Sequence, residues 1–333
     1  MKQGTGSPSL ALQKILVTGG TGYLAANLIN RLENTDCHIV RLGRPGKVFT
    51  PMSGVARTED VRGDICQRAT WERSLDGITT IFHFAAQTSA YVAEENPQAD
   101  LEVNVLPMLQ LLEICRENDW HPSILFSGTV TETGIPESLP VDETHPDQPV
   151  TIYDLHKLMA ENYLKYYSQQ GIVRGAILRL ANVYGPGPRS SSPDRGMLNQ
   201  MVRRALGGEA LTIYGRGEHV RDYIYVEDVV QAFLQAVQNI ERVNGRHFVI
   251  GTGQGHTIAE SVKLVAERVA KKTGRLVPVK HIDSPVSQSP IEARDFVADS
   301  SRFSQATGWR GRVSLIDGID RTIDYWLTEN GAN

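Results

Sequence analysis

The sequence contains little cysteine, and the placement of that cysteine excludes two common ways of stabilising a fold. Of 333 residues only three are cysteines, Cys37, Cys66 and Cys115, and none belongs to a C-x-x-C motif or lies beside a group of histidines. This spacing predicts neither a disulfide framework nor a zinc site, and no residue is predicted to bind a metal. We therefore expect a reduced, cytoplasmic setting.

The sequence also lacks an excess of positive charge. Its 34 lysines and arginines are outnumbered by 38 aspartates and glutamates, which gives a net charge of -4 at pH 7. Nucleic acids and anionic membranes attract basic surfaces, so neither is expected to be the main partner. No apolar run approaches the length of a membrane span. Residues 1–13 lack the pattern of a secretory signal and are predicted to form a flexible N-terminal tail.

Strand-like and helix-like segments alternate over the first half of the chain. The predicted strands cover 14–18, 37–42, 78–84, 123–126 and 176–180. The predicted helices between them cover 23–32, 101–117 and 153–168. Such alternation, with strands that are mostly apolar, is typical of an α/β fold built on a doubly wound parallel sheet.

The pattern changes after about Asn182. The sequence GPGP and the polar loop 189–195 precede a predicted helix at 197–206, a short strand at 211–214, a Gly-rich connection and a last helix at 315–327. We interpret 14–182 as the first domain, which also receives 220–250. Residues 183–333 are predicted to form a smaller mixed α/β C-terminal lobe that binds the substrate and interleaves with the end of the sheet.

The loop after the first predicted strand has the spacing of a phosphate-binding turn. Gly19, Gly22 and Ala25 follow the pattern G-x-x-G-x-x-A between that strand and the next helix. Small residues let the backbone approach a pyrophosphate, and a helix N-terminus favours negative charge. A purely structural turn could use the same residues, but the strand before and the helix after favour a dinucleotide site. The sheet is therefore predicted to be of the Rossmann type, with 14–182 as its dinucleotide-binding domain.

The end of the second strand indicates which dinucleotide would bind. An NAD enzyme usually carries Asp or Glu there to hold the ribose 2′-hydroxyl. This chain reads HIVRLGR at 38–44, in which Gly43 replaces the carboxylate and Arg44 or Arg41 could pair with a 2′-phosphate. The cofactor is thus expected to be NAD(P), with NADP(H) favoured over NAD(H). Arginines that are simply solvated in a loop are the alternative.

Residues 151–167 carry apolar side chains at three- and four-residue steps, as a helix packed on a core does. Tyr153 and Lys157 lie one turn apart on roughly the same face. A lysine ammonium favours the phenolate and lowers a phenol pKa that is ordinarily near ~10. The pair could therefore remove the proton of a hydroxyl. A chance pair on a helix surface is the alternative, and the pair alone does not decide between them.

Several short stretches stand in an order that one known family shares. They read TGGTGYLA (18–25), GDI (63–65), HFAA (83–86), NV (104–105), FSGT (126–129) with Gly134, YDLHK (153–157), LRLANVYGP (178–186) and RDYIYVED (221–228), with a weaker echo at 298–299 and 308–309. In this order they resemble the extended short-chain dehydrogenase/reductase family of nucleotide-sugar epimerases, dehydratases and reductases. The resemblance implies an NAD(P)-dependent enzyme acting on a nucleotide-diphosphate sugar.

The resemblance also implies roles for individual residues. The catalytic residues would be Tyr153 as acid/base, Lys157, and Thr129, which would hydrogen-bond the same substrate oxygen. The residues expected at the cofactor are Gly19, Gly22, Tyr23, Leu24, Arg44, Asp64, Ile65, Phe84, Ala85, Ala86, Asn104, Tyr153 and Lys157. Those expected at the substrate are Thr129, Asn182, Arg221 and Arg294.

Four of these residues have plain structural alternatives. Thr129 could simply be a β-branched residue that ends a strand, and Asp64 a turn aspartate. Asn104 could be a buried amide. Arg221 suits a phosphate, but an ordinary salt bridge with Asp222 or Asp228 is possible.

The resemblance is weaker at the residues that would determine which reaction is catalysed. Dehydratases of the family generally follow the Ser/Thr with an Asp-Glu pair, and decarboxylases keep a glutamate two residues on; here Val130 and Thr131 follow Thr129. Without those carboxylates, 4,6-dehydration and decarboxylation lack their proton shuttle. The stretch ETG at 132–134 replaces the family's VYG, which predicts an unusual substrate wall. Near the C-terminus, SPIEARD at 289–295 replaces the RPGD stretch of many relatives, so either Arg294 substitutes for its arginine or the nucleotide is held differently.

Three hypotheses remain. The favoured one is a nucleotide-sugar epimerase that oxidises a sugar carbinol, most plausibly at C4, and returns the hydride to the other face. The alternative is an NADPH-dependent reductase of a nucleotide-linked 4-keto-6-deoxy sugar, favoured by Arg44. A less favoured third is a catalytically silent cofactor-binding sensor. The resemblance further implies a homodimer, for which Leu109, Leu112, Leu158 and Tyr166 are candidates, although a core role explains them equally well.

Overall fold

The computed structural model describes residues 10–189, 194–285 and 288–331. Its main feature is a seven-stranded parallel sheet in the order β10-β6-β5-β4-β1-β2-β3. The strands are β1 (Lys14–Thr18), β2 (His38–Gly43), β3 (Arg57–Arg62), β4 (Thr80–His83), β5 (Ser123–Thr129), β6 (Arg174–Leu180) and β10 (Arg246–Ile250). The central strands are buried on both faces, which is why they read as continuous apolar runs.

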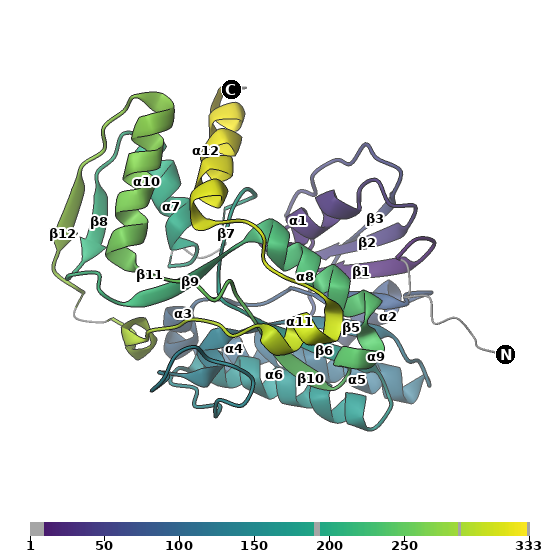
Figure 1. The fold of residues 1–333 in the computed structure, drawn as a ribbon. Helices are drawn as coiled ribbons and strands as arrows, with labels where there is room; N and C mark the ends of the chain where they lie inside the picture. The colour runs from purple at the N-terminus through teal and green to yellow at the C-terminus, as the bar shows by residue number, and fades with distance from the viewer. Residues whose placement is uncertain (1–9, 190–193, 286–287, 332–333) are drawn as a thin grey trace.

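Helices cover both faces of this sheet (Figure 1). On one face α1 (Tyr23–Leu32) packs beside α8 (Val226–Gln238), with α9 (Ile240–Val243) and α11 (Ser301–Thr307) further along. On the other face α2 (Arg68–Ser74), α5 (Leu106–Glu117) and α6 (Ile152–Gln169) lie side by side. Two short helices, α3 (Ala90–Glu95) and α4 (Pro97–Asn104), pack against α6. The predicted α/β doubly wound fold is confirmed.

The order of the strands indicates where a binding crevice lies. From β1 the chain continues to β2 and β3 on one side, and later returns through β4, β5 and β6 on the other. The direction of winding therefore reverses between β1 and β4. In such sheets the ligand crevice opens beyond the carboxyl ends of the strands at the reversal point. The glycine loop follows β1, Phe84 follows β4, and Thr129 ends β5 at this same edge.

A smaller mixed lobe stands beside the sheet (Figure 1). It contains a three-stranded sheet of β7 (Asn182–Tyr184), β9 (Val220–Tyr225) and β11 (Gly255–Thr257), and a parallel pair of β8 (Leu211–Tyr214) and β12 (Val279–Ile282). Three helices, α7 (Met197–Leu206), α10 (Ile258–Thr273) and α12 (Leu315–Gly331), share a separate apolar core with these strands. Within the segment 220–250, β9 lies in this lobe. In contrast, β10 is a strand of the large sheet, and α8 and α9 pack against that sheet.

Two predicted elements differ from the structure. The helix predicted at 101–117 is divided into α4 and α5, because Pro107 lies in the first turn of α5 and a proline cannot continue a helix from the residues before it. The predicted tail is shorter than 1–13. Leu10 is 5% exposed within the main core, and the amide of Leu12 donates to the carbonyl of Asp36. Residues 1–9 lie outside the described part of the chain. Within the described ranges, no helix combines the length and apolar character of a bilayer span.

Candidate active site

The loop between β1 and α1 closely approaches the loop after β4. Gly19 has φ +65°, and a Cβ there would lie 3.0 Å from the amide nitrogen of Ala85. A Cβ on Gly22 would lie 3.0 Å from the carbonyl oxygen of Gly19. Both positions therefore require the absence of a side chain. The backbone amides at the start of α1 are left free to face a ligand, so these residues fit the pyrophosphate of a dinucleotide.

His83 and Thr18 hold the two loops together. Oγ1 of Thr18 accepts hydrogen bonds from the amides of Phe84 and Ala85, each at 3.1 Å, and lies 3.0 Å from Nδ1 of His83. Burial, together with the nearby charge of Lys157, lowers the pKa of His83 to about 3. The imidazole is therefore neutral. With its two amide donors in place, the Thr18 hydroxyl directs its own hydrogen to Nδ1 of His83.

The other predicted cofactor residues surround this crevice. Tyr23 and Leu24 form the first turn of α1, and Phe84, Ala85 and Ala86 follow β4, all with partly exposed side chains. Ile65 is buried in the core beside α2. Asp64 is exposed, and its Oδ1 accepts a 3.0 Å hydrogen bond from the amide of Cys66, as a turn aspartate does.

The two arginines near the end of β2 differ in their exposure and in their partners. Arg41 is 5% exposed; its Nε donates to Asp60 and its Nη1 to the carbonyl of Thr50, both at 2.6 Å. The strand neighbour Asp60 thus neutralises it, and the suggestion that Arg41 binds a 2′-phosphate is not supported by its partners. Arg44 is exposed in the loop that follows. Gly43 has no room for a side chain, since a Cβ there would lie 2.9 Å from the ring of Phe49.

Asn104 belongs to a buried polar network under the site. Its Oδ1 accepts from the amide of Gln87 at 3.1 Å, and its Nδ2 donates to Asp100 at 2.9 Å and to the carbonyl of Gln87 at 3.1 Å. Asp100 also lies 2.7 Å from Nδ1 of His156. His156 is therefore a buried partner of Asp100. The amide of Asn104 shapes the loop at Gln87.

Tyr153 and Lys157 lie on the buried face of α6. The Nζ of Lys157 is 3.8 Å from the ring centroid of Phe126 in β5. Burial lowers the pKa of this ammonium to about 8, against the opposing charges of Glu132, Glu161 and Asp100. The lysine thus titrates close to neutral pH.

The phenol of Tyr153 corrects one expectation. Burial raises its pKa above the ordinary value instead of lowering it, and the opposing positive charge is that of Arg195. The guanidinium carbon of Arg195 lies 5.1 Å from the centroid of the Tyr153 ring. The lowering predicted from Lys157 alone is absent because the cost of burying a phenolate is larger.

Thr129 is held at the end of β5 from two sides. Its amide donates to Oε1 of Glu132 at 2.9 Å, which forms one half of a capping box around the 3₁₀ turn η1 (Val130–Thr133). Its Oγ1 lies 2.8 Å from Oγ1 of Thr131, which in turn donates to the carboxylate of Asp154. Oδ2 of Asp154 accepts from Thr151, the N-cap of α6, at 2.7 Å. The hydroxyl of Thr129 is therefore linked to the residue that follows Tyr153.

Glu132 lies in the core and not on a substrate wall, contrary to expectation. It has no exposed surface, and its Oε2 lies 3.0 Å from Nε of Arg179. Arg179 makes hydrogen bonds to Glu161 at 2.6 and 2.9 Å and to Asp147 at 2.5 Å. Burial and the charge of Glu161 raise the pKa of Glu132 well above its usual range. Against the effect of burial, Arg179 and Lys165 hold the pKa of Glu161 low. Glu132 is accordingly the neutral member of this pair.

Two buried arginines from the smaller lobe lie together. Nη1 of Arg221, on β9, donates to the carbonyl of Arg294, and its Nη2 donates to the carbonyl of Glu292 at 2.8 Å. Nε of Arg294 is buried and has no hydrogen-bond partner in the described structure. Burial and the charge of Arg221 lower the pKa of Arg294 to about 10. The unpaired Nε of Arg294, together with the positive charge of Arg221 beside it, suits a diphosphate. Asn182 lies partly exposed on β7, opposite Tyr223 of β9.

Three residues of this region were not predicted as site residues: Asp154, Glu132 and Arg195. Asp154 and Glu132 are charged residues that the fold buries, and their sequence positions carried no signal of that burial. Arg195 comes from the loop between β7 and α7, 42 positions from Tyr153 along the chain. Only the folded chain brings it over the phenol.

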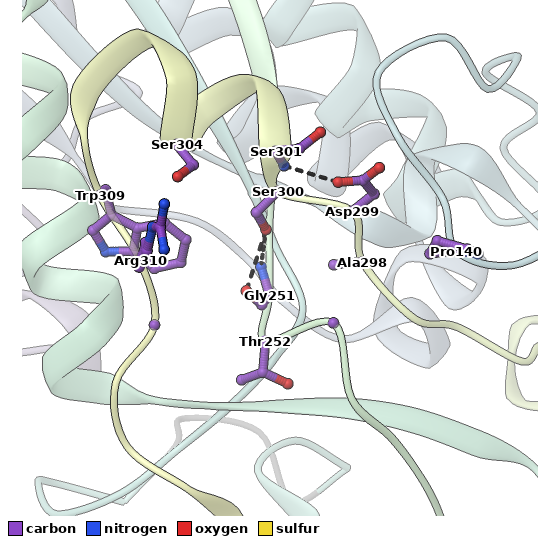
Figure 2. Close-up of a pocket in the computed structure, with 12 residues that line it drawn as sticks. Pro140, Gly251, Thr252, Ala298, Asp299, Ser300, Ser301, Ser304, Trp309 and Arg310 are labelled. Carbon is purple, nitrogen blue, oxygen red and sulfur yellow. Dashed lines mark hydrogen bonds between the residues drawn. The ribbon is translucent and has the colours of Figure 1, made fainter.

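A separate cavity of about 400 Å³ opens between the end of β10 and the start of α11 (Figure 2). Gly251, Thr252, Asp299, Trp309 and Arg310 are among its lining residues. The hydroxyl of Ser300 bonds both the amide and the carbonyl of Gly251 across it, at 3.0 and 3.2 Å. None of the predicted catalytic, cofactor or substrate residues lines this cavity.

Solved structures similar to this chain include two sugar-nucleotide epimerases. The UDP-glucose 4-epimerase of Thermotoga maritima, solved with UDP-glucose, is 28% identical and superposes with a TM-score of 0.84 over 96% of this chain and 100% of that one. The UDP-glucose 4-epimerase of Thermus thermophilus, solved in complex with NAD, is 28% identical with a TM-score of 0.79 over 95% of this chain and 99% of that one.

Sequence comparison also finds a relative that is named for another nucleotide and another sugar carbon. The CDP-paratose 2-epimerase of Salmonella typhi is 27% identical over 94% of this chain and 98% of its own length. The profile of the NAD dependent epimerase/dehydratase family matches residues 15–251, which is more than half of the chain. The glycine loop, the Tyr153–Lys157 helix and the end of β5 all lie within the matched region. The chain is therefore an enzyme of the NAD-dependent epimerase/dehydratase family.

Proposed function

We propose that this enzyme is a nucleotide-sugar 4-epimerase whose substrate is a UDP-hexose. The observation that carries the proposal is the convergence of Tyr153, Lys157 and Thr129 at the carboxyl edge of the sheet, beside the dinucleotide loop. The 4-epimerases of Thermotoga maritima and Thermus thermophilus, similar over nearly the whole chain, support both the nucleotide and the carbon. The CDP-paratose 2-epimerase shows that family members also vary in these two features.

In this proposal the site residues divide the work between proton transfer and binding. Bound NAD(P) supplies the hydride acceptor and donor at its nicotinamide ring. Tyr153 takes the proton of the sugar hydroxyl during oxidation and returns it during reduction. Thr129 hydrogen-bonds the same oxygen, and Lys157 contributes positive charge beside the phenol. Arg221, Arg294 and Asn182 bind the diphosphate end of the substrate.

The buried carboxyl groups argue against dehydration. A dehydratase needs an acid and a base that reach the sugar, and here Val130 and Thr131 follow Thr129. Glu132 has no exposed surface and gives one oxygen to the amide of Thr129. Asp154 is likewise buried and bound by Thr131 and Thr151. Neither carboxyl is presented to a substrate.

We further infer that the enzyme accepts NADP(H), through Arg44. This arginine is exposed at the end of β2, where Gly43 leaves no carboxylate for a ribose 2′-hydroxyl. The same feature favours the second candidate function, an NADPH-dependent reductase of a nucleotide-linked 4-keto-6-deoxy sugar, because NADPH is the usual reducing agent. A cofactor-binding sensor without turnover is the third candidate.

One experiment separates these functions. The cofactor released from freshly purified protein would be identified by mass spectrometry, and the protein assayed for interconversion of UDP-glucose and UDP-galactose without added cofactor. Tightly held, near-stoichiometric NAD with interconversion would support the epimerase and overturn the role of Arg44. Substoichiometric cofactor, NADPH bound more tightly than NADH, and no interconversion would support the reductase.

We also propose a homodimer formed through α5 and α6. Tyr166 is 57% exposed on α6, and Leu155 is exposed on the same helix. Leu109 and Leu158 are partly exposed, whereas Leu112 has no exposed surface and serves the core. An apolar face with exposed aromatic and aliphatic groups suits a symmetric helix contact. Light scattering that gives only the monomer mass would overturn this proposal.

A further inference from the structure

A chain of two hydrogen bonds joins the hydroxyl of Thr129 to a buried carboxyl, and a third hydrogen bond reaches that carboxyl from Thr151. Oγ1 of Thr129 and Oγ1 of Thr131 are 2.8 Å apart, and either can be the donor. The hydroxyl of Thr131 also bonds Oδ1 of Asp154, whose Oδ2 accepts from Thr151 at 2.7 Å. Asp154 directly follows Tyr153 in the sequence, so the chain links the end of β5 to the first turn of α6.

Each hydroxyl has a single hydrogen, so the direction of the whole chain depends on its last member. If Asp154 is ionised it can only accept, so Thr131 donates to it and Thr129 must donate to Thr131. Thr129 then presents a lone pair to the substrate. If Asp154 is protonated it can donate to Thr131, Thr131 can donate to Thr129, and Thr129 presents its hydrogen.

The two directions suit the two forms of the substrate oxygen. A sugar hydroxyl about to be oxidised needs an acceptor for its hydrogen, whereas the keto intermediate needs a donor to its carbonyl oxygen. We infer that Asp154 is a positioning residue whose protonation state sets, through Thr131, whether Thr129 accepts from the alcohol or donates to the ketone. This inference rests on the proposed hydride-transfer function.

The surroundings of Asp154 allow both protonation states. Burial raises its pKa, while hydrogen bonds from Thr131 and Thr151 and the charges of Arg195 and Arg294 oppose the rise. The ionisable groups within one turn of it on its own helix are Tyr153, His156 and Lys157. Other elements around it contribute Glu94 on α3, which accepts from the amide of Ile152, Asp100 on α4, Glu132 in η1, Arg195 before α7 and Arg294 after η2 (Pro290–Ala293).

The test measures how pH divides the bound substrate between alcohol and ketone. Full-length protein loaded with NAD(P)⁺ is mixed with UDP-glucose, and the fraction of reduced nicotinamide at equilibrium is read from its absorbance and fluorescence. Oxidation also releases the hydroxyl proton, which lowers the reduced fraction as the pH falls in every variant, and Thr131→Val measures that background. Relative to this background, the reduced fraction of the unmodified enzyme should rise about threefold to tenfold as the pH falls through the ionisation of Asp154, the effect of one hydrogen bond to the carbonyl.

Three variants separate the relay from other titrating groups. Thr131→Val cuts the chain and Asp154→Asn removes the ionisation, so both should abolish the rise. Thr151→Val removes a donor to the other carboxylate oxygen without cutting the chain. It should keep the rise and move its midpoint to higher pH, because the ionised form loses a hydrogen bond. Circular dichroism confirms that each variant is folded.

Two outcomes would overturn this inference and leave the proposed function uncontradicted. They are an unchanged pH dependence in Thr131→Val, or an unmodified enzyme whose reduced fraction depends on pH in the same way as that of Asp154→Asn. If UDP-glucose, UDP-galactose and their 2-acetamido analogues all produce no reduced nicotinamide, the proposed function fails, and this inference fails with it.

Discussion

The carboxyl of Glu132 and the guanidinium of Arg179 lie 3.0 Å apart in a fully buried position behind Thr129. Nε of Arg179 is nevertheless directed at Glu161, to which it donates at 2.9 Å, and Oε2 of Glu132 receives no hydrogen bond of its own. A neutral carboxyl that donates to Glu161 accounts for this arrangement. Glu132 thus adds a hydrogen bond behind Thr129 without adding a buried charge.

Replacing this carboxyl by an amide should change how stability depends on pH. The pKa of Glu132 is raised in the folded protein. Its contribution to stability is therefore complete below the unfolded pKa, near ~4.3, and is lost as the pH rises toward the folded pKa. Glu132→Gln cannot ionise in either state. We expect its stability relative to the unmodified protein to improve by up to about 1.4 kcal/mol per pH unit above that value.

Urea unfolding at about pH 5 and about pH 7 measures this difference. Arg179→Met is the contrasting variant, because it removes two hydrogen bonds to the buried Glu161 and leaves it only Lys165 as a cationic donor, and should cost about 3 kcal/mol or more. A pH-independent difference between Glu132→Gln and the unmodified protein would show that Glu132 is ionised in the fold.

Tyr153→Phe should abolish turnover without disturbing the fold or the cofactor site. The proposed acid/base contribution predicts a loss of about 10² to 10⁴ in kcat. The melting temperature and the cofactor content should stay unchanged, because no hydrogen bond of the phenol holds the described structure together. Steady-state kinetics and mass spectrometry of released cofactor check this. Retained turnover would remove Tyr153 from the mechanism, and retained biological activity without turnover would favour the sensor.

Arg294→Met should separate substrate binding from stability. The Nε of Arg294 is unpaired and its Nη1 donates to the carbonyl of Ile291 at 2.9 Å, so removal of the guanidinium should cost about 1 kcal/mol. The KM for the nucleotide sugar should rise about tenfold to a hundredfold through the loss of charge-assisted bonds to the diphosphate. Kinetics and urea unfolding of the same preparation give both quantities.

Arg221→Met provides the matched control for that variant. Its guanidinium holds the carbonyls of Val220, Glu292 and Arg294. We expect the loss of these bonds to destabilise the protein by about 2 kcal/mol or more, in addition to raising KM. Equal losses of stability in the two arginine variants would contradict the distinction between a binding and a structural guanidinium.

Arg44→Ala tests the cofactor proposal. If Arg44 pairs with a 2′-phosphate, the Kd for NADPH should rise about tenfold while that for NADH stays the same, and added salt should reduce the difference. Lys47→Ala, another exposed cation of the same loop, should leave both constants unchanged. Calorimetry with both cofactors supplies the measurement. Equal effects of Arg44→Ala on the two cofactors would leave NADP(H) without support.

Tyr166→Glu tests the homodimer. Its ring is largely exposed on α6, so a carboxylate there should leave the monomer fold intact and charge the proposed contact. Light scattering should then show dissociation at micromolar concentration, with unchanged circular dichroism. A dimer that survives the substitution would place the contact on another face.

Local patterns were enough to predict the elements that build the crevice. The β-branched run of β1, the glycine spacing and the apolar periodicity of α1 and α7 gave the bounds that the structure has at Lys14–Thr18, Tyr23–Leu32 and Met197–Leu206. The edge strand β3 was missed because RTEDVR is charged and mostly exposed, so that no apolar alternation marks it. Its pairing with β2 also places Asp60 opposite Arg41, so that Asp60 accepts a hydrogen bond from the Arg41 guanidinium.

By itself the sequence determined the fold class, the glycine loop after β1 and the position of Tyr153 and Lys157 one turn apart on α6, because each depends on residues close together in the chain. Only the tertiary structure decided the electrostatics of the site. Burial raises the pKa of Tyr153, Arg195 lies over its ring, and Thr131 joins Thr129 to Asp154. These effects depend on desolvation and on contacts between distant segments, neither of which is visible in local spacing.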